Sequence, residues 1–223
     1  MEVVTLKNVE KKYILGKTEV HALRGLNLVV NKGDICILKG HSGSGKSTTL
    51  NIIGGMDLPT SGEVHIAGHD ISRLNDYQLS MMRRKHIGFI FQSFNLIPVL
   101  NALENVAYPL HLQKVTHAKQ KAKEALKRVG LGDYLHHRPN ELSGGQIQRV
   151  AIARGIVAEP DIILADEPTA NLDSKTSLQI LELMLELNKE QGLTFVVSTH
   201  HQMMMESATK TIELVDGEVC FMN

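Results

Sequence analysis

The chain has 223 residues, of which 43% are hydrophobic and 22% are charged, a balance typical of an ordinary globular protein. Lysine plus arginine and aspartate plus glutamate number 24 each, which argues against a nucleic-acid surface built on net positive charge. No stretch approaches the roughly 20 apolar residues of a membrane span, and the first residues do not follow the pattern of a secretory signal.

Short runs of β-strand character dominate the first part of the chain. Residues 3–9 and 26–30 alternate or cluster apolar side chains, and residues 31–34 have the composition of a turn. The apolar run 35–38 is short enough to be a buried strand rather than a helix. This strand leads directly into a glycine-rich segment.

That segment matches the phosphate-binding pattern G-x-x-x-x-G-K-[ST]. It consists of Gly40, His41, Ser42, Gly43, Ser44, Gly45, Lys46 and Ser47. Glycines allow successive backbone N–H groups to turn inward around phosphates, Lys46 can reach the outer phosphates, and the Ser47 hydroxyl can bind Mg²⁺. A helix over 46–53 that ends at the glycine pair 54–55 completes the expected strand–loop–helix context.

Helical signals prevail over residues 95–158, after a further buried strand at 87–91. Thr116 is the predicted N-cap of a helix that ends at Gly130. Its apolar face is predicted to contain Ala118, Ala122, Ala125, Leu126 and Val129. A second helix is predicted over 146–158, where Glu159 and Pro160 stop it.

A second small-residue turn opens that last helix. It contains Ser143, Gly144, Gly145 and Gln146. Such a turn offers backbone N–H donors to an anion, as the start of any helix does. The chain therefore carries two segments suited to bind phosphate, about a hundred residues apart.

Strand character returns after residue 158, in the runs 162–165, 195–198, 211–215 and 218–222. The pair Asp216-Gly217 predicts a tight hairpin between the last two runs. A helix over 174–190 separates two of the strands, which implies a parallel connection. These elements predict an α/β core interrupted by a helical insertion.

Two carboxylates, Asp166 and Glu167, follow the buried strand 162–165. In a phosphate-loop enzyme this place holds Mg²⁺, so we expect Asp166 to orient the water shell of the metal. Glu167 would point to the other side of an extended backbone and act as general base toward water. The alternative, a solvated acidic turn, is disfavoured by the phosphate loop upstream.

The remaining histidines, cysteines and methionines have simpler interpretations. Histidine pairs such as His65 and His69 lack the carboxylate or cysteine spacing of a metal site and are interpreted as solvated or packing residues. Cys36 and Cys220 are isolated and fit reduced thiols of a cytosolic protein. The run 203–205 of methionines is interpreted as packing on a short helix.

Together these motifs resemble the nucleotide-binding subunit of ATP-binding-cassette (ABC) transporters, over essentially the whole chain. The resemblance implies that Gln92 completes the Mg²⁺ shell and senses a membrane subunit, and that Tyr13 stacks on adenine. It places Thr48 at the nucleotide and makes His200, in 198–200, the switch histidine that touches the terminal phosphate. The segment Asn171-Leu172-Asp173 resembles the loop that crosses the dimer.

Within the family, the chain is most similar to small ATPases of lipoprotein-releasing, macrolide-exporting and cell-division complexes. The segments 13–23, 51–57, 91–98 and 102–106 carry this similarity. The sequence departs from the usual pattern at Ile147, Gly155 and His201. None of these departures removes a group implied to act in catalysis.

The resemblance implies a P-loop NTPase core with an antiparallel β-subdomain, over 1–94 and 159–223, and an inserted α-helical subdomain over 95–158. Two copies would enclose two ATP molecules with Mg²⁺, each site pairing one phosphate loop with Ser143, Gly144 and Gly145 of the other copy. An integral membrane permease subunit would dock near 94–98 and the early helical insertion, so the protein would lie in the cytoplasm at the inner face of the plasma membrane.

Two rival functions follow from the same family. An ABC ATPase acting on DNA needs a long coiled-coil or zinc insertion, for which 223 residues of neutral charge leave no room. A regulator that signals through a membrane protein to cell-wall or cell-division enzymes remains an open alternative to transport.

Overall fold

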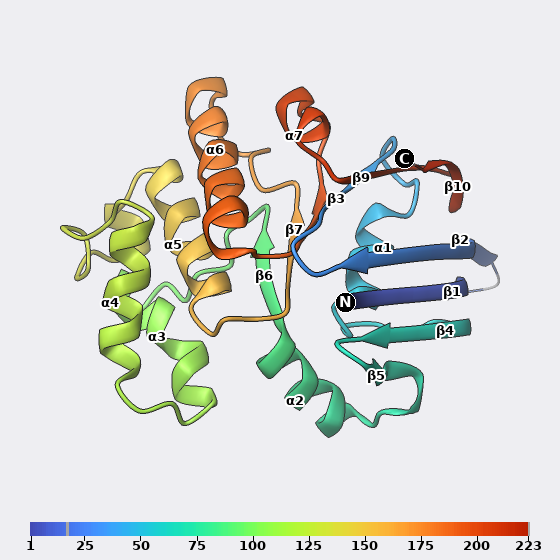
Figure 1. Cartoon of the computed structure of the whole chain (residues 1–223), viewed down its shortest axis with the longest axis horizontal. Helices are drawn as coiled ribbons and strands as arrows, with labels where there is room; N and C mark the ends of the chain where they lie inside the picture. The colour runs from blue at the N-terminus through green and yellow to red at the C-terminus, as the bar shows by residue number, and fades with distance from the viewer. Residues whose placement is uncertain (17, 223) are drawn as a thin grey trace.

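Two β-sheets organise the chain in the computed structural model, which describes residues 1–16 and 18–222 (Figure 1). A 4-stranded sheet has the order β2-β1-β4-β5, and a 6-stranded sheet has the order β10-β9-β3-β8-β7-β6. The strands are β1 (Glu2–Leu15), β2 (Thr18–Asn31), β3 (Ile35–Lys39), β4 (Ser61–Ile66), β5 (His69–Asp70), β6 (Ile87–Phe91), β7 (Ile162–Asp166), β8 (Phe195–Ser198), β9 (Lys210–Val215) and β10 (Glu218–Met222). The helices are α1 (Lys46–Ile53), α2 (Asp76–His86), α3 (Ala102–Leu112), α4 (Ala118–Arg128), α5 (Gly144–Ile156), α6 (Ser174–Gln191) and α7 (Gln202–Glu206).

The 6-stranded sheet is parallel except at its edge strand β10, which pairs antiparallel with β9. Side chains of β3 alternate between two hydrophobic cores: Ile35 and Ile37 enter the core shared with α3 to α6, whereas Cys36 and Leu38 enter the core between the sheets. Because both faces are covered, the first four residues of the strand, 35–38, are all apolar. The predicted parallel connection through α6 is confirmed, since β7 and β8 pair in parallel.

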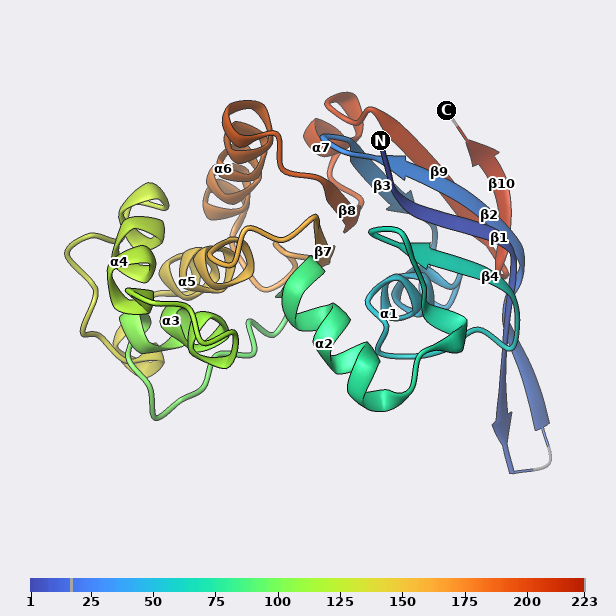
Figure 2. The same ribbon diagram turned by 60° about the horizontal axis from the view of Figure 1, so that its bottom comes forward.

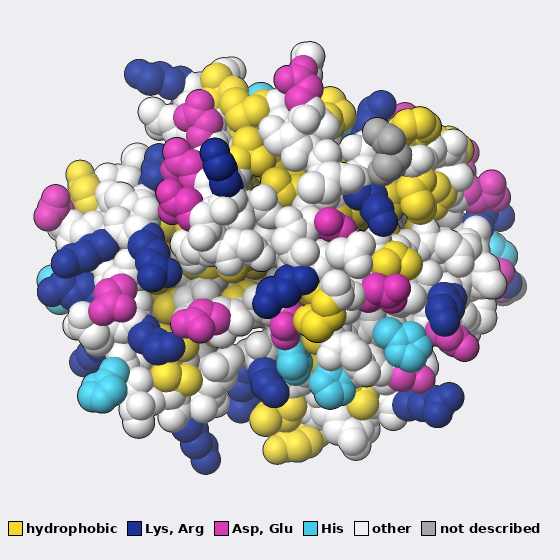
Figure 3. Space-filling view, viewed as in Figure 1, with side chains coloured by type: hydrophobic (Ala, Val, Ile, Leu, Met, Phe, Trp, Pro, Cys, Tyr) yellow, Lys and Arg dark blue, Asp and Glu magenta, His cyan; other side chains and the backbone are white. Residues whose placement is uncertain are grey.

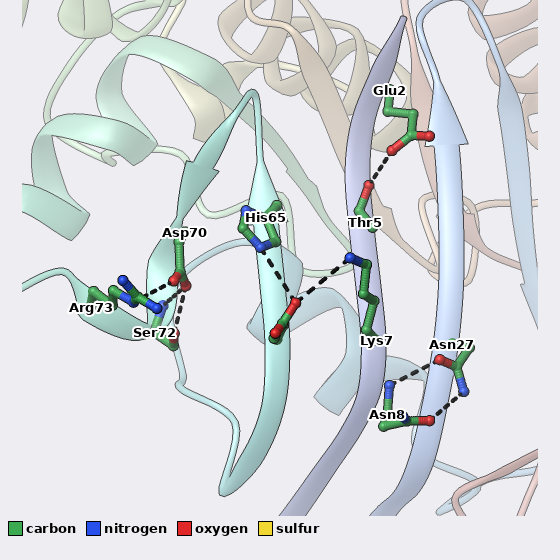
Figure 4. A network of polar contacts seen from close by, with 10 residues as sticks. Glu2, Thr5, Lys7, Asn8, Asn27, His65, Asp70, Ser72 and Arg73 are labelled. Atoms are coloured by element: carbon green, nitrogen blue, oxygen red, sulfur yellow. Dashed lines mark hydrogen bonds and ion pairs between the residues drawn. The ribbon is translucent and has the colours of Figure 1, made fainter.

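The antiparallel sheet is built on a hairpin longer than predicted, because β1 and β2 each run for 14 residues. Figure 2 shows this hairpin projecting beyond the other elements. The pairing shifts register between Leu6 and Val9, where Asn8 has a φ of 48°. There the Asn8 backbone N–H donates to Asn27 Oδ1 at 2.9 Å, and the Asn27 side-chain amide donates to Asn8 Oδ1 at 3.1 Å, as Figure 4 shows.

Helix α1 lies between the two sheets. Its residues Leu50, Ile52 and Ile53 are buried in the core that both sheets share. It ends at the predicted glycines, where the Gly54 N–H donates to the Leu50 carbonyl and Gly55 takes a φ of 58°. This packing fixes Lys46, at the start of α1, close to the end of β3.

Helices α3, α4 and α5 lie together on one side of the 6-stranded sheet (Figure 1). The predicted apolar face of α4 is confirmed as buried, and Lys and Arg side chains gather over its outer face in Figure 3. The predicted cap at Thr116 is wrong. His117 is the N-cap, with a φ of 59° and no side-chain cap, and its carbonyl accepts the N–H of Gln120 and of Lys121.

Candidate functional site

A cavity of about 470 Å³ lies at the ends of β3 and β7. It is lined by Val20, His21, Ala22, Ser42, Gly43, Gly45, Lys46, Ser47, Thr48, Gln92, Asp166, Glu167 and His200. The structure thus brings together predicted residues that follow four different strands, β3, β6, β7 and β8. The carboxyl ends of parallel strands are where open α/β sheets bind ligands.

The phosphate loop joins β3 to α1. Its Gly45 is the N-cap of α1 in the left-handed region, with a φ of 106°, and no side chain caps this helix. The buried Lys46 ammonium donates to the carbonyls of Gly40 and His41, at 2.6 and 2.9 Å. An uncapped helix start beside a lysine is suited to a phosphate group.

Asp166 is the last residue of β7 and is held in place by β8. Its Oδ1 accepts a hydrogen bond of 2.5 Å from the Ser198 hydroxyl, and Ser198 is fully buried. Ser47 and Gln92 line the same cavity and supply a hydroxyl and an amide oxygen. These oxygen donors, together with the Asp166 carboxylate, fit the preference of Mg²⁺.

Glu167 does not continue the extended backbone, which corrects the sequence prediction. Its φ is 43°, because its N–H turns back to the Ser198 carbonyl and hydroxyl, at 3.1 and 3.0 Å. A non-glycine residue in this region costs about 1–3 kcal/mol, a strain common at functional sites. Glu167 Oε1 lies 4.0 Å from His200 Nε2. Both side chains line the cavity, where a carboxylate could accept a proton from water.

Tyr13 is not among the residues that line the cavity. Its hydroxyl donates a 2.7 Å hydrogen bond to Asp57, and the Lys11 ammonium lies 4.9 Å from the ring centre. Burial, and after it this hydrogen bond, raises the pKa of Tyr13. The stacking role predicted for Tyr13 therefore stays a prediction.

The Ser143–Gln146 turn lies outside the cavity of its own chain. Ser143 caps α5: its hydroxyl accepts the Gln146 N–H at 3.4 Å, and Gln146 Oε1 accepts the Ser143 N–H at 2.9 Å. A Cβ on Gly145 would lie 2.5 Å from a Thr176 methyl, so the turn packs closely on α6. Ser143 and Gly144 are nevertheless exposed.

Asp173 also serves its own helix. It is the N-cap of α6, accepting N–H groups of Lys175 and Thr176 at 3.1 and 3.0 Å. A further hydrogen bond from the Thr176 hydroxyl is the main cause that lowers the Asp173 pKa.

Three cavity residues escaped sequence reasoning as binding residues. Val20, His21 and Ala22 belong to β2, whose long pairing with β1 brings them to the phosphate loop. They belong to no phosphate-binding pattern, so only their proximity reveals them.

Comparisons with known proteins show the family to which this chain belongs. A family model described as "ABC transporter" matches residues 23–170. An "Uncharacterized ABC transporter ATP-binding protein" of Thermotoga maritima is 51% identical, over 98% of this chain and 94% of that protein. The "Lipoprotein-releasing system ATP-binding protein LolD" of Alcanivorax borkumensis is 46% identical, over 96% and 95%.

A longer relative and a solved structure complete the comparison. The "Macrolide export ATP-binding/permease protein MacB" of Bdellovibrio bacteriovorus is 43% identical over 97% of this chain, which matches 33% of that protein. A dimeric post-hydrolysis structure of the ATP-binding cassette MJ0796 of Methanocaldococcus jannaschii, bound to ADP and Pi, superposes with a TM-score of 0.90. It is 47% identical, and the match covers 99% of this chain and 97% of that one.

Proposed function

This chain belongs to the ABC transporter family as a dimerising, ATP-hydrolysing subunit, and we propose that each of its ATP sites is shared between two copies. The observation that carries the proposal is the position of the Ser143–Gly145 turn. The turn has the features of an anion-binding element, yet its own chain's cavity lies elsewhere. The exposed Ser143 and Gly144 can then contact ATP held by the phosphate loop of the second copy.

We assign the chemistry to residues of this one cavity. Lys46 binds the outer phosphates, while Ser47, Gln92 and Asp166 would hold Mg²⁺. The ion, when bound, would offset the negative charge of the phosphates. Glu167 accepts a proton from the attacking water, and His200, 4.0 Å away, contacts the terminal phosphate.

Mixing two inactive variants tests the shared site. Lys46→Ala disables the phosphate loop, and Ser143→Arg blocks the turn, so we expect neither variant alone to hydrolyse ATP. A heterodimer of the two retains one intact site. An equimolar mixture should therefore associate on addition of ATP and regain up to about a quarter of wild-type turnover, because half of random dimers are mixed. A mixture that neither associates nor hydrolyses ATP would refute sharing.

We further propose that an integral membrane permease binds this subunit at the inner face of the plasma membrane. Within residues 1–16 and 18–222, no helix combines the length and hydropathy needed to cross a bilayer. Several exposed apolar residues lie on α2, α3 and the nearby turn after α1, namely Met56, Tyr77, Met81, Tyr108 and Leu112. Met56 lines a cavity of about 410 Å³, Tyr77 and Met81 line one of about 760 Å³, and Leu112 lines both. Exposed apolar side chains around such cavities are typical of an interaction site.

The docking role predicted for the loop 94–98 stays a prediction, and contacts within the fold already hold part of this loop. Leu96 packs partly buried against the helical core, and Arg154 holds the carbonyls of Phe94 and Asn95, at 2.9 and 2.6 Å. We therefore place the docking surface mainly on α2 and α3.

We also propose that residues 95–158 form a helical subdomain, which is inserted into a core made from residues 1–94 and 159–223.

A further inference from the structure

Three segments that are distant in sequence, one of them the phosphate loop, contact one another. They are the middle of β2 at Ala22 to Arg24, the phosphate loop itself, and the turn at Asp216 and Gly217 between β9 and β10. The Gly217 N–H donates to the Ser44 carbonyl at 3.1 Å, and the Arg24 N–H donates to the Gly217 carbonyl at 2.8 Å. We propose that this turn is a brace that holds the phosphate loop in its ATP-binding form, with Gly217 as the positioning residue.

Ser44 depends on its main chain for its position. It is fully buried, and its hydroxyl has no hydrogen-bond partner within the described residues. Its N–H donates to the His41 carbonyl at 3.2 Å, inside the same loop. The bond from Gly217 is therefore the polar contact that ties Ser44 to another part of the fold.

Glycine is required at position 217 for two separate reasons. Its φ is 83°, in the left-handed region that favours glycine. A Cβ there would lie 2.7 Å from the Ala22 carbonyl oxygen and 3.0 Å from the Ala22 carbonyl carbon. These atoms belong to the backbone of β2, so relief requires a shift of β2 or of the turn.

Such a shift would reach the ATP cavity on two sides. Ala22 itself lines the cavity, and a Cβ on the lining residue Gly45 would be 2.8 Å from the same Ala22 oxygen. The phosphate loop and β2 are therefore packed so closely that a shift of one displaces the other. A Cβ on Gly45 would also lie 3.7 Å from the Gly217 Cα.

Side chains add little to the brace. Arg24 Nε donates to the Asp216 carbonyl at 3.1 Å. His41 Nε2 lies 3.7 Å from Asp216 Oδ1, but both side chains are more than half exposed, at 56% and 83%. Exposed pairs of this kind contribute little. The backbone contacts of Gly217 carry the effect.

The expected consequence is weaker ATP binding with unchanged chemistry. A loop that is already ordered binds phosphate without a further loss of conformational entropy. This inference rests on the proposed ATP site and concerns only how its loop is held. Disrupting the brace should raise the Kd for ATP, while Glu167 and His200 stay in place and turnover at saturating ATP persists.

The test compares Gly217→Ala with Gly68→Ala in the full chain. Gly68 has a φ of 81° but no neighbour within 4 Å of its Cβ position, so it reproduces the backbone strain without the collision. In equilibrium titrations with ATP and Mg²⁺, Gly217→Ala should weaken binding about tenfold or more, and Gly68→Ala by less than about twofold. Equal affinities of the two variants would refute the brace, even if both lose thermal stability.

A second measurement covers the case in which Gly217→Ala does not fold. In the wild-type chain without nucleotide, hydrogen exchange of the Gly217 N–H should be about a hundredfold or more slower than in an unstructured peptide, because this N–H is bonded to the Ser44 carbonyl. Exchange of this amide at the rate of an unstructured peptide would overturn the proposal. Failure of the wild-type chain to bind ATP would instead refute the nucleotide site itself, so the two failures are distinguishable.

Discussion

The Asn171 side-chain amide donates a hydrogen bond of 2.9 Å to the main-chain carbonyl of Gln92. Gln92 directly follows β6 and lines the ATP cavity, whereas Asn171 lies in the loop between β7 and α6. The bond therefore connects the segment expected to sense the membrane partner with the segment expected to cross the dimer. A shift of either segment would be transmitted to the other through this contact.

Replacing Asn171 tests that connection. Asn171→Ala should leave the ATP affinity of a single chain within about twofold of wild type but weaken the ATP-driven dimer about fivefold or more. The dimer can be measured by light scattering against protein concentration. Asn75→Ala removes the side-chain cap of α2 and is the control, since it should not affect association. Association of Asn171→Ala at wild-type concentrations would contradict the connection.

The next prediction concerns Glu167. In the Glu167→Gln variant the side-chain amide cannot accept a proton from water. Turnover should therefore fall by about 10² or more, while ATP affinity is preserved. The ATP-bound dimer should then accumulate and become visible by light scattering. Glu159→Gln is a suitable control, because Glu159 also has a positive φ, 52°, and its ion-pair partner among residues 1–16 and 18–222 is the surface residue Lys121. A Glu167→Gln variant that keeps most of its ATPase activity would exclude the general-base role.

Local signals were sufficient to predict the elements that surround the phosphate loop. The bounds of α1, β6 and β8 match their predicted ranges, because the phosphate-loop motif and the glycine pair 54–55 delimit α1 and polar residues border the two strands. By contrast, β4 was not predicted, and the hairpin β1–β2 is longer than expected. Their extent depends on pairing between segments far apart, such as Thr5 with His65, which no local window contains.

Prediction of the site from local sequence was limited in the same way, by contacts between segments far apart in the chain. Motifs predicted the phosphate loop, Gln92 and the carboxylates, which meet in one cavity, whereas the predicted Tyr13 and Ser143–Gln146 turn lie outside it. The φ of Glu167 was mispredicted because hydrogen bonds to Ser198, 31 positions further along the chain, determine it. Val20 and Ala22 contribute only by their position against the loop, and side chains this ordinary give no signal in a sequence.

Tyr13 gives a third prediction. Stacking of a base on an aromatic ring contributes about 1–3 kcal/mol, so Tyr13→Ala should weaken ATP binding by roughly 5- to 150-fold. Tyr13→Phe is the informative control, because it keeps the ring but loses the hydroxyl that Asp57 holds. It should retain most of the affinity in an equilibrium titration. If Tyr13→Ala binds ATP like wild type, another residue contacts the adenine.

The two cysteines should differ in reactivity and in their effect on stability. Burial raises the pKa of the Cys36 thiol to about 12, whereas Cys220 is exposed. A thiol reagent near pH 8 should label one thiol per native chain of the wild type, and none in Cys220→Ser. Two labels on the native wild type would contradict this prediction.

The same pKa shift of Cys36 should make the free energy of unfolding depend on pH. An unfolded thiol ionises near pH ~8.5, so Cys36 should stabilise the folded state fully below that pH. This contribution should decline between about pH 8.5 and 12, by up to about 1.4 kcal/mol per pH unit, and be absent in Cys36→Ala.

The last prediction concerns the docking surface on α2 and α3. Met81 and Leu112 are exposed to 41% and 43%, and both line the cavity of about 760 Å³. Replacing both by Ser removes apolar area without opening the core, so Tm and ATP affinity should stay near wild type. Stimulation of the ATPase by the membrane subunit in a reconstituted complex should nevertheless be lost.

Ile14→Ser supplies the matched control, because Ile14 is 79% exposed but lies on the β1–β2 hairpin, away from α2 and α3. It should leave stimulation intact. Substituting Leu96 would be a poorer test, since that side chain packs against the helical core and its loss would also affect folding. Undiminished stimulation of the Met81→Ser, Leu112→Ser double variant, with an intact thermal transition, would place the permease on another surface.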